Sequence, residues 1–262
     1  MTILEFNEKK RRKEKIVMVT CYDYSSAKIA ALSEVDALLV GDSLAMTMFG
    51  ESSTLPATTE LIARHTQAVV KGAPNKLVVA DMPFLSYRQD LNHTMASVAA
   101  CMRTGAQAVK IEGAKGNESV IKHVVESGVP VMGHLGLTPQ SVHQLGGYKV
   151  QGRESQKAAN IIKEAKDLES WGCFSLVLEC VPSALARTIS QELEIPVIGI
   201  GAGPDTDGQI LVWQDLLGQN LDFKPKFVRK YLDGQKLITD ALNEYATDVK
   251  KNKFPNVTES FE

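Results

Sequence analysis

The chain of 262 residues contains 44% hydrophobic and 23% charged residues, the composition of a globular protein with a large core. Its net charge is −2, from 29 Lys and Arg against 31 Asp and Glu, so no overall field favours nucleic acid or an anionic membrane. No apolar run approaches the roughly 18 to 20 residues of a membrane helix. The binding partners of this protein must therefore be determined by local sites.

The opening segment and the cysteines favour a cytoplasmic protein. Residues 1–15 are rich in charge and lack the apolar core of a secretory signal. The charge run at residues 8–15 contains acids and no aromatic residues, which is typical of a solvated helix face rather than a nucleic-acid patch. The four cysteines form no C-x-x-C pair and no zinc-finger spacing, as expected for reduced thiols that pack in the interior.

One unit recurs along the chain: a short run rich in Val, Ile and Leu, then a polar or glycine-containing turn, then a longer helical pattern. The runs predict eight strands, at residues 16–23, 37–43, 77–84, 108–113, 129–136, 175–181, 196–203 and 209–215. Apolar residues at i, i+3, i+4 and i+7 predict outer helices within residues 58–73, 91–106, 117–128, 154–172 and 183–194. An N-terminal helix and a helical C-terminal extension over residues 223–252 complete the prediction.

Regular alternation of strand and helix predicts an α/β protein with parallel strands. Eight strands with near-continuous apolar runs, in a chain of this length, favour a (β/α)8 TIM barrel. An open doubly wound sheet is the alternative, although eight units without a break in composition exceed what it usually contains. No linker divides the sequence, so we expect a single domain over residues 1–262.

Acidic residues stand where the predicted strands end. Asp42 closes the second strand, Asp81 the third, Glu112 the fourth and Glu179 the sixth, while His134 closes the fifth. In a barrel of this kind the carboxyl ends of the strands form one active-site cup. The sequence therefore predicts that four carboxylates converge there.

A divalent cation would resolve the repulsion within such a cluster. Mg²⁺ prefers oxygen ligands and leaves positions for water and for substrate oxygens, so it is the metal we expect. Lys110 lies two residues before Glu112 and therefore points to the same face of its strand. There it would neutralise surplus negative charge or bind a substrate carboxylate.

Each of these residues also has a structural interpretation. Asp42 and Asp81 could be turn residues, and Glu112 could be a loop acid paired with Lys110. His134 could be a hydrogen-bonded imidazole without a catalytic role. Glu179 is hardest to explain in this way, because it stands in an apolar run where acids seldom occur unpaired. The occurrence of acids at four strand ends together favours a functional site over these separate structural interpretations.

Several longer motifs resemble one known family. The runs VGDSLAM, STLPATT, VVADMPF, VKIEGA, GHLGLTPQS, GGYKVQGR, LVLECVP, IPVIGIGAG and DGQILV, in this order, resemble ketopantoate hydroxymethyltransferases. The resemblance implies a barrel of the phosphoenolpyruvate/pyruvate superfamily. It also implies transfer of a hydroxymethyl group from 5,10-methylenetetrahydrofolate to 3-methyl-2-oxobutanoate through a Mg²⁺-stabilised enolate, which yields 2-dehydropantoate for pantothenate biosynthesis.

The resemblance also implies roles for individual residues. Asp42 and Asp81 match metal-binding aspartates that also face the substrate, and Glu112 matches a further acid of the metal site. Ser43 and Lys110 match substrate contacts, and Glu179 matches the proton acceptor. A homo-oligomer, usually a decamer, is implied as well.

Two other functions remain open at this level. One is a Mg²⁺-dependent lyase or mutase of the same superfamily that acts on 2-oxo acids, although such lyases need a cysteine acid in a characteristic loop and neither Cys173 nor Cys180 has that setting. The other is a barrel without catalytic activity. That alternative predicts a missing acid at one strand end, and the sequence lacks none.

Overall fold

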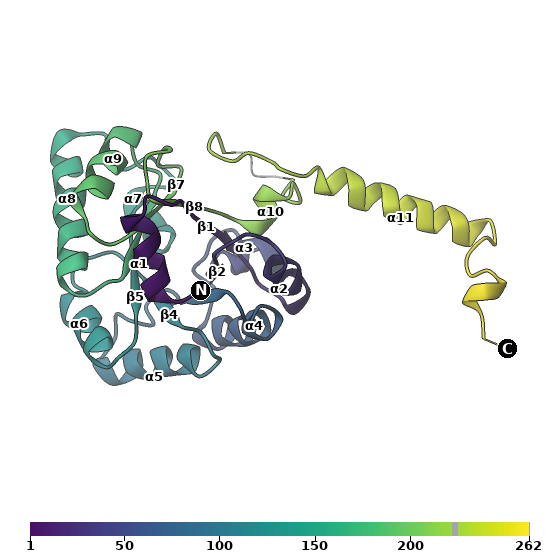
Figure 1. Cartoon of the computed structure of the whole chain (residues 1–262), viewed down its shortest axis with the longest axis horizontal. Helices are drawn as coiled ribbons and strands as arrows, with labels where there is room; N and C mark the ends of the chain where they lie inside the picture. Colours follow the sequence, from purple (N-terminus) through teal and green to yellow (C-terminus); the bar gives the residue numbers. More distant parts are fainter. Residues whose placement is uncertain (222–224, 262) are drawn as a thin grey trace. The chain divides into compact units, whose positions relative to one another are not determined.

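The computed structural model describes residues 1–221 and 225–261, and eight parallel strands close into a barrel in chain order (Figure 1). β8 pairs with β1, where Leu211 lies opposite Val19, so the sheet has no free edge. The predicted (β/α)8 barrel is confirmed, and the open sheet is excluded. The strands are β1 (Ile16–Thr20), β2 (Ala37–Val40), β3 (Leu77–Asp81), β4 (Ala108–Glu112), β5 (Val131–Gly136), β6 (Ser175–Glu179), β7 (Val197–Ile200) and β8 (Gly208–Leu211).

Most strands end a few residues earlier than the apolar runs predicted. After β4, β6 and β7 the backbone takes a positive φ at Gly113 (79°), Cys180 (47°) and Gly201 (61°), which ends the extended conformation. The prediction for residues 209–215 is wrong in its second half, because a short helix, α10 (Trp213–Leu216), follows β8. Apolar composition alone does not show where a chain turns away from a sheet.

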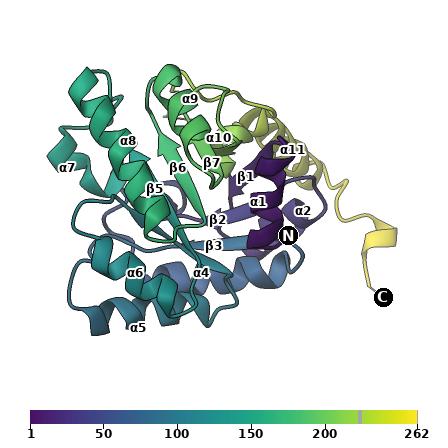
Figure 2. The same cartoon turned by 60° about the vertical axis from the view of Figure 1, so that its left-hand side comes forward.

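Helices cover the outside of the strands, as the 3.6-residue patterns predicted (Figure 2). Asp23, Thr58 and Asp90 cap three of them by accepting a hydrogen bond from a backbone N–H of the first turn. The five predicted outer helices are confirmed, and α2 and α3 are additional. The outer helices are α2 (Tyr24–Ala31), α3 (Leu44–Phe49), α4 (Thr59–Gly72), α5 (Leu91–Met102), α6 (Glu118–Glu126), α8 (Ser155–Ser170) and α9 (Ser183–Glu192).

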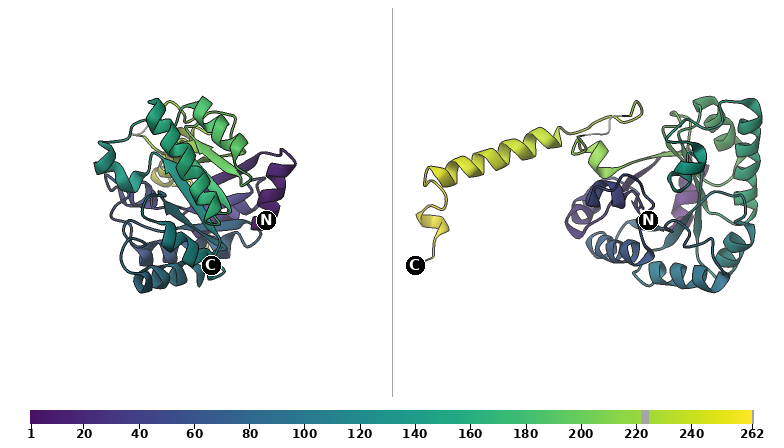
Figure 3. Two further views of the ribbon diagram at one scale, coloured as in Figure 1. Left: turned by 90° about the vertical axis from the view of Figure 1, so that its left-hand side faces the viewer. Right: turned by 180° about the vertical axis from the view of Figure 1, so that it is seen from behind.

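The N-terminal helix α1 (Ile3–Arg11) lies across the strands where they begin (Figure 3). Its Phe6 is fully buried in a core cluster with residues from the start of several strands, and its ring meets Phe174 edge to face at 5.8 Å. On its polar face Lys10 forms a 2.9 Å ion pair with Asp207. The helix thus closes the amino end of the barrel and leaves the carboxyl end as the open mouth.

The side chains that fill the barrel lead directly to its mouth. Along β3 the core residues Leu77 and Val79 are followed on the same face by Asp81, because side chains alternate with a period of two. Along β4 Ala108 is followed in the same way by Lys110 and Glu112. The rigid strands therefore hold polar groups over an apolar floor.

The contacts between residues divide the chain into two units, Met1–Val212 and Trp213–Glu262. The second contains α10, α11 (Gly234–Lys250) and a 3₁₀ helix, Val257–Glu259. The predicted helical extension over residues 223–252 is confirmed for α11 and wrong for residues 225–233, which form turns and bends. Residues 223 and 224 lie outside the described part. The single domain over residues 1–262 stays a prediction. Over the described residues, no helix is both long and apolar enough to span a membrane.

A glycine at the end of β5 allows β6 to pass close beside it. Gly136 has a φ of 90°, and a Cβ atom at this position would lie 2.2 Å from the backbone oxygen of Glu179. Gly128 has a similar φ of 85° but has no heavy atom within 4 Å of such a Cβ. Gly128→Ala should therefore cost about 1 kcal/mol through backbone strain alone.

We expect Gly136→Ala to lower the free energy of unfolding by a further 1 to 3 kcal/mol, roughly, because the backbone near Glu179 must shift. Urea denaturation of both variants measures the difference. Equal losses in the two variants would contradict a close approach of the two strands at Gly136.

Candidate active site

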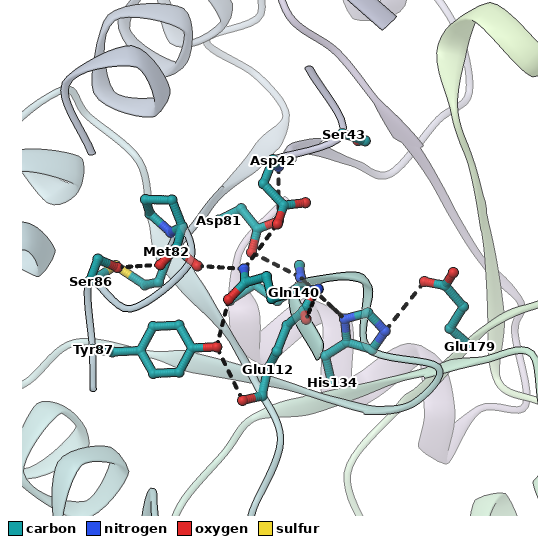
Figure 4. A network of polar contacts seen from close by, with 12 residues as sticks. Asp42, Ser43, Asp81, Met82, Ser86, Tyr87, Glu112, His134, Gln140 and Glu179 are labelled. Carbon is teal, nitrogen blue, oxygen red and sulfur yellow. Dashed lines mark hydrogen bonds and ion pairs between the residues drawn. The ribbon is translucent and has the colours of Figure 1, made fainter. Parts of the chain in front are cut away.

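The polar residues at the strand ends come together at the mouth of the barrel (Figure 4). The register places Asp81 opposite Lys110, Glu112 opposite His134 and Gly136 opposite Glu179. Asp42, Asp81, Lys110 and Glu112 are all at most 4% exposed. The convergence that the sequence predicted is confirmed, and the acids lie in a largely buried network rather than in solvated turns.

Asp42 and Asp81 are adjacent although they come from different strands. The backbone N–H of Asp42 donates a 3.0 Å hydrogen bond to Oδ2 of Asp81. Asp42 stands two residues beyond the end of β2, after Gly41, so the turn rather than the strand sets its direction. The two carboxylates therefore share one side of the cup.

Lys110 lies between the acids of two strands. Its Nζ is 2.8 Å from Oδ1 of Asp81 and 3.3 Å from Oε1 of Glu112. Burial lowers the pKa of the ammonium, but the charges of Asp81, Glu112 and Asp42 outweigh it and raise the pKa above its ordinary value. A cation in this position neutralises part of the negative charge, which is one of the two roles the sequence suggested.

His134 connects Glu112 with Glu179. Its Nδ1 is 3.2 Å from Oε1 of Glu112, and its Nε2 is 3.4 Å from Oε2 of Glu179. Burial and Lys110 lower the pKa of the imidazole, but the two carboxylates outweigh them and raise it to about 9. Burial likewise raises the pKa of Glu112, yet Lys110 and His134 bring it down to about 2. These shifts favour the protonated imidazole of His134 and the ionised carboxylate of Glu112.

Two residues of the network were missed by the sequence analysis. Gln140, in the 3₁₀ helix η1 (Pro139–Ser141) that follows β5 and precedes the short helix α7 (Val142–Leu145), donates through Nε2 to Oδ2 of Asp42 at 2.9 Å. The hydroxyl of Tyr87 donates to Oε1 of Gln140 at 2.7 Å. Gln140 lies within the quoted motif GHLGLTPQS, which was a usable signal, whereas nothing in the sequence around Tyr87 marked it.

Ser43 forms a hydrogen bond with a tyrosine, Tyr22, for which the sequence predicted a position in a strand but no role in the site. The hydroxyl of Tyr22 lies 2.8 Å from Oγ of Ser43. Tyr22 is fully buried, and burial raises the pKa of its phenol to about 12, so the hydroxyl stays protonated at neutral pH. Ser43 thus stands beside Asp42 with one fixed hydrogen-bonding partner.

The charge balance and the donor types at the mouth fit a divalent cation. Burial raises the pKa of Asp42 well above its ordinary value, and the neighbouring charges of Asp81 and Glu112 add to this effect. Burial also raises the pKa of Asp81, although Lys110 opposes it. When ionised, the four acids exceed the cations Lys110 and His134 by two negative charges. Carboxylate oxygens that are unfavourable as free anions are suitable ligands for Mg²⁺.

Over the described residues, no group of three or more His, Cys, Asp or Glu side chains is arranged so that it could hold a metal ion. The carboxylate of Glu112 forms ion pairs with Lys110 and His134. A pair of carboxylates, Asp42 and Asp81, completed by water and substrate oxygens is the usual arrangement for Mg²⁺. The metal role of Glu112 stays a prediction.

Replacing Asp42 should change the stability of the protein when no metal is bound. Asp42→Asn removes a buried charge next to Asp81, so we expect the metal-free protein to gain about 1 kcal/mol in free energy of unfolding at pH 7. The folded-state pKa lies above the unfolded value of about 3.9, so the wild type loses stability as the pH rises through that interval. The advantage of the variant should therefore grow as the pH increases from about 4.

Urea denaturation at several pH values measures this effect. Asp36→Asn is the control, because Asp36 forms a 2.7 Å ion pair with Lys9 and its replacement should lower stability. A less stable Asp42→Asn protein at neutral pH would contradict the unfavourable burial of this carboxylate.

The fold and the mouth together define an α/β-barrel enzyme that carries its acids at the carboxyl ends of the strands. A sequence model of one family, ketopantoate hydroxymethyltransferase, matches residues 1–257. The chain belongs to this family and is a hydroxymethyltransferase.

Relatives with curated names agree with this assignment. A 3-methyl-2-oxobutanoate hydroxymethyltransferase of Bdellovibrio bacteriovorus is 57% identical over 260 residues, which cover 99% of each chain. Enzymes with the same name from Coxiella burnetii and Francisella tularensis are 55% and 54% identical, over 98% and 97% of this chain and 97% and 96% of their own lengths.

Solved structures of other enzymes share the fold. A phosphonopyruvate hydrolase in complex with oxalate and Mg²⁺ superposes with a TM-score of 0.64 at 10% identity, over 99% of this chain and 93% of that chain. A 2,3-dimethylmalate lyase, described as a member of the PEP mutase/isocitrate lyase superfamily, reaches 0.62 at 15% identity, over 99% and 91%. At such identities the similarity concerns the fold alone.

Proposed function

We propose that this chain transfers a hydroxymethyl group from 5,10-methylenetetrahydrofolate to 3-methyl-2-oxobutanoate and thereby forms 2-dehydropantoate. The observation that carries the proposal is the cup in which Asp42, Asp81, Glu112 and Glu179 surround Lys110 and His134 at the mouth of the barrel. The relatives named above, which bear the name of this activity, support the choice of substrate.

Asp42 and Asp81 are the residues that we propose as protein ligands of Mg²⁺. When bound, Mg²⁺ would supply a Lewis acid that polarises the keto group of the 2-oxo acid and stabilises the negative charge of its enolate. Lys110 and Glu112 would support these two ligands without binding the metal themselves. Lys110 balances the charge of Asp81, and Glu112 keeps Lys110 and His134 in place through contacts of 3.2 to 3.3 Å.

Glu179 is the group that we propose to remove the proton from C3 of the 2-oxo acid. Its side chain is 17% exposed, more than the other acids of the cup, and it stands at the end of β6 apart from the pair Asp42 and Asp81. His134, whose Nε2 is 3.4 Å from Oε2 of Glu179, orients this carboxylate. A base that faces the pair from another strand can reach the carbon next to the keto group.

Ser43 and Lys110 would contact the bound 2-oxo acid. The hydrogen bond with Tyr22 leaves Ser43 Oγ in a fixed position beside Asp42, where it could bind a substrate oxygen. The ammonium of Lys110, charged and buried, would attract the substrate carboxylate. The enolate carbon would then form a bond to the methylene carbon of the folate. The bonds from that carbon to the folate nitrogens break, hydroxide from water takes their place to give the hydroxymethyl group, and tetrahydrofolate leaves with the remaining protons on its nitrogens.

The enolisation step can be tested without the folate. Protein, Mg²⁺ and 3-methyl-2-oxobutanoate are incubated in D₂O, and the C3 proton is followed by NMR. We expect exchange that depends on both protein and Mg²⁺, and formation of 2-dehydropantoate once methylenetetrahydrofolate is added. Folded protein that shows neither exchange nor product would contradict the proposed reaction.

The assembly of the chain is a separate proposal. We infer a homo-oligomer, because α11 exposes large apolar side chains, among them Leu237, Leu242 and Tyr245 at 53 to 62%. The decamer and the cytoplasmic location expected from the sequence stay predictions. Light scattering coupled to gel filtration measures the mass in solution, and a monomer at micromolar concentration would contradict the inference.

A further inference from the structure

Gln140 is a neutral, buried residue in the middle of the acidic cup. It is 5% exposed and lies in the first turn after β5, where its side chain reaches towards β2 and β3 (Figure 4). None of the roles described so far uses this residue, although it contacts groups from three strand ends. Its contacts indicate what it does there.

Every hydrogen-bonding group of the Gln140 amide has a partner. Nε2 donates to Oδ2 of Asp42 and to the backbone oxygen of Met82, each at 2.9 Å. Oε1 accepts from the hydroxyl of Tyr87 at 2.7 Å. The carbonyl of Met82 can only accept, so the amide cannot be turned over without losing two bonds.

The backbone of the same residue holds a second acid. The N–H of Gln140 donates to Oε2 of Glu112 at 3.1 Å. One residue therefore fixes a carboxylate that follows β2 and a carboxylate at the end of β4. Gln140 thus links Asp42 to Glu112 across the cup.

Asp42 depends on this link more than the other acids do. Asp81, Glu112 and Glu179 end strands, and each has a cationic neighbour, whereas Asp42 lies in a turn. Among the hydrogen bonds of the described residues, the one from Gln140 is the only one that reaches the carboxylate of Asp42. It occupies Oδ2, so the direction of Oδ1 follows from it.

We propose that Gln140 is a positioning residue that holds Asp42 with one carboxylate oxygen engaged and the other presented to Mg²⁺. The inference rests on the proposed function, in which Asp42 is a metal ligand. Residues that orient metal ligands typically contribute about 10- to 100-fold to metal affinity. Gln140 carries no charge, so it would orient the carboxylate without changing the net charge of the cup.

Two substitutions test this role. Gln140→Met keeps the length of the side chain and removes both donors, while Gln140→Glu replaces the amide by a carboxylate facing Asp42. We expect both to weaken Mg²⁺ binding about 10- to 100-fold in calorimetric titrations with 3-methyl-2-oxobutanoate present, Gln140→Glu the more strongly. At saturating Mg²⁺, Gln140→Met should regain most of its kcat.

The wild type is titrated first, and the results separate the two proposals. If the wild type binds no Mg²⁺ in the presence of the 2-oxo acid, the proposed function fails. If it binds Mg²⁺ and folded Gln140→Met binds it equally well, the positioning role alone is overturned. A purely structural role would lower the free energy of unfolding and leave the Mg²⁺ affinity of the folded protein unchanged.

A third variant keeps the test decisive if neither Gln140 variant folds. Tyr87→Phe leaves both donors of Gln140 in place but removes the hydroxyl that fixes the other end of the amide. It should weaken Mg²⁺ binding about 3- to 10-fold, the effect of one hydrogen bond. Unchanged affinity in this variant would then overturn the proposal.

Discussion

Glu179→Gln should slow exchange of the C3 proton of 3-methyl-2-oxobutanoate by about 10²- to 10⁴-fold, the usual contribution of a general base. The amide has nearly the same shape and can still lie beside His134, but it cannot take up a proton. Binding of the 2-oxo acid and Mg²⁺ should persist, because neither Asp42 nor Asp81 contacts Glu179 through any hydrogen bond or ion pair of the described residues. Exchange in D₂O followed by NMR, together with calorimetry, measures both effects.

The control for this experiment is Glu192→Gln. Glu192 also lies beside a cation, with a 2.8 Å ion pair to Lys166, but it stands on α9 outside the barrel and its side chain is 40% exposed. Its replacement should leave exchange unchanged. Undiminished exchange in folded Glu179→Gln protein would show that another group removes the proton.

Lys110→Met should lower the free energy of unfolding by about 3 to 5 kcal/mol, the loss expected when one partner of a buried ion pair is removed. Met has a similar length and fills the same space, so the loss would come from charge. Asp81 and Glu112 would remain buried without their shared cation, which now lies 2.8 and 3.3 Å from them. Urea denaturation measures the change, and activity should be lost as well.

The pH dependence identifies the cause. The pKa of Glu112 is lowered to about 2, so its contribution to stability is present above the unfolded value of about 4.3 and is lost as the pH falls towards 2. The difference in free energy of unfolding between the wild type and Lys110→Met should therefore become smaller at acid pH. Lys163→Met breaks an exposed pair with Asp167 that solvent screens, so it should lower the free energy of unfolding far less than Lys110→Met. An equal loss in both variants would contradict the role of burial.

The strand ends could be predicted because a parallel barrel makes a local pattern into a spatial one. Each apolar run ends near the same rim, so the acid that closes it must face the same cup. Lys110 and Glu112 could be paired from their spacing of two, and their 3.3 Å contact confirms this. The roles of Ser43 and Glu179 came from resemblance alone and stay proposals.

Residues that act across the barrel were less accessible to sequence reasoning. Gln140 follows Pro139 in a short turn whose composition favours no particular partner, and Asp42 lies 98 positions away in the chain. Tyr87 and Tyr22 are ordinary buried aromatic residues in sequence, and only their hydroxyl contacts reveal a role. His134 was left undecided between a structural and a functional role, and its place between Glu112 and Glu179 could not be derived from one strand.

The sequence by itself determined the eight strands, five of the seven outer helices, the barrel and the gathering of acids at its mouth, because these depend on local periodicity and on parallel pairing. The tertiary structure decided which acids share a cation, which atom of Gln140 faces Asp42, and how Tyr22 meets Ser43. Such contacts depend on turns and rotamers that join residues far apart in the chain, and periodicity carries no information about them.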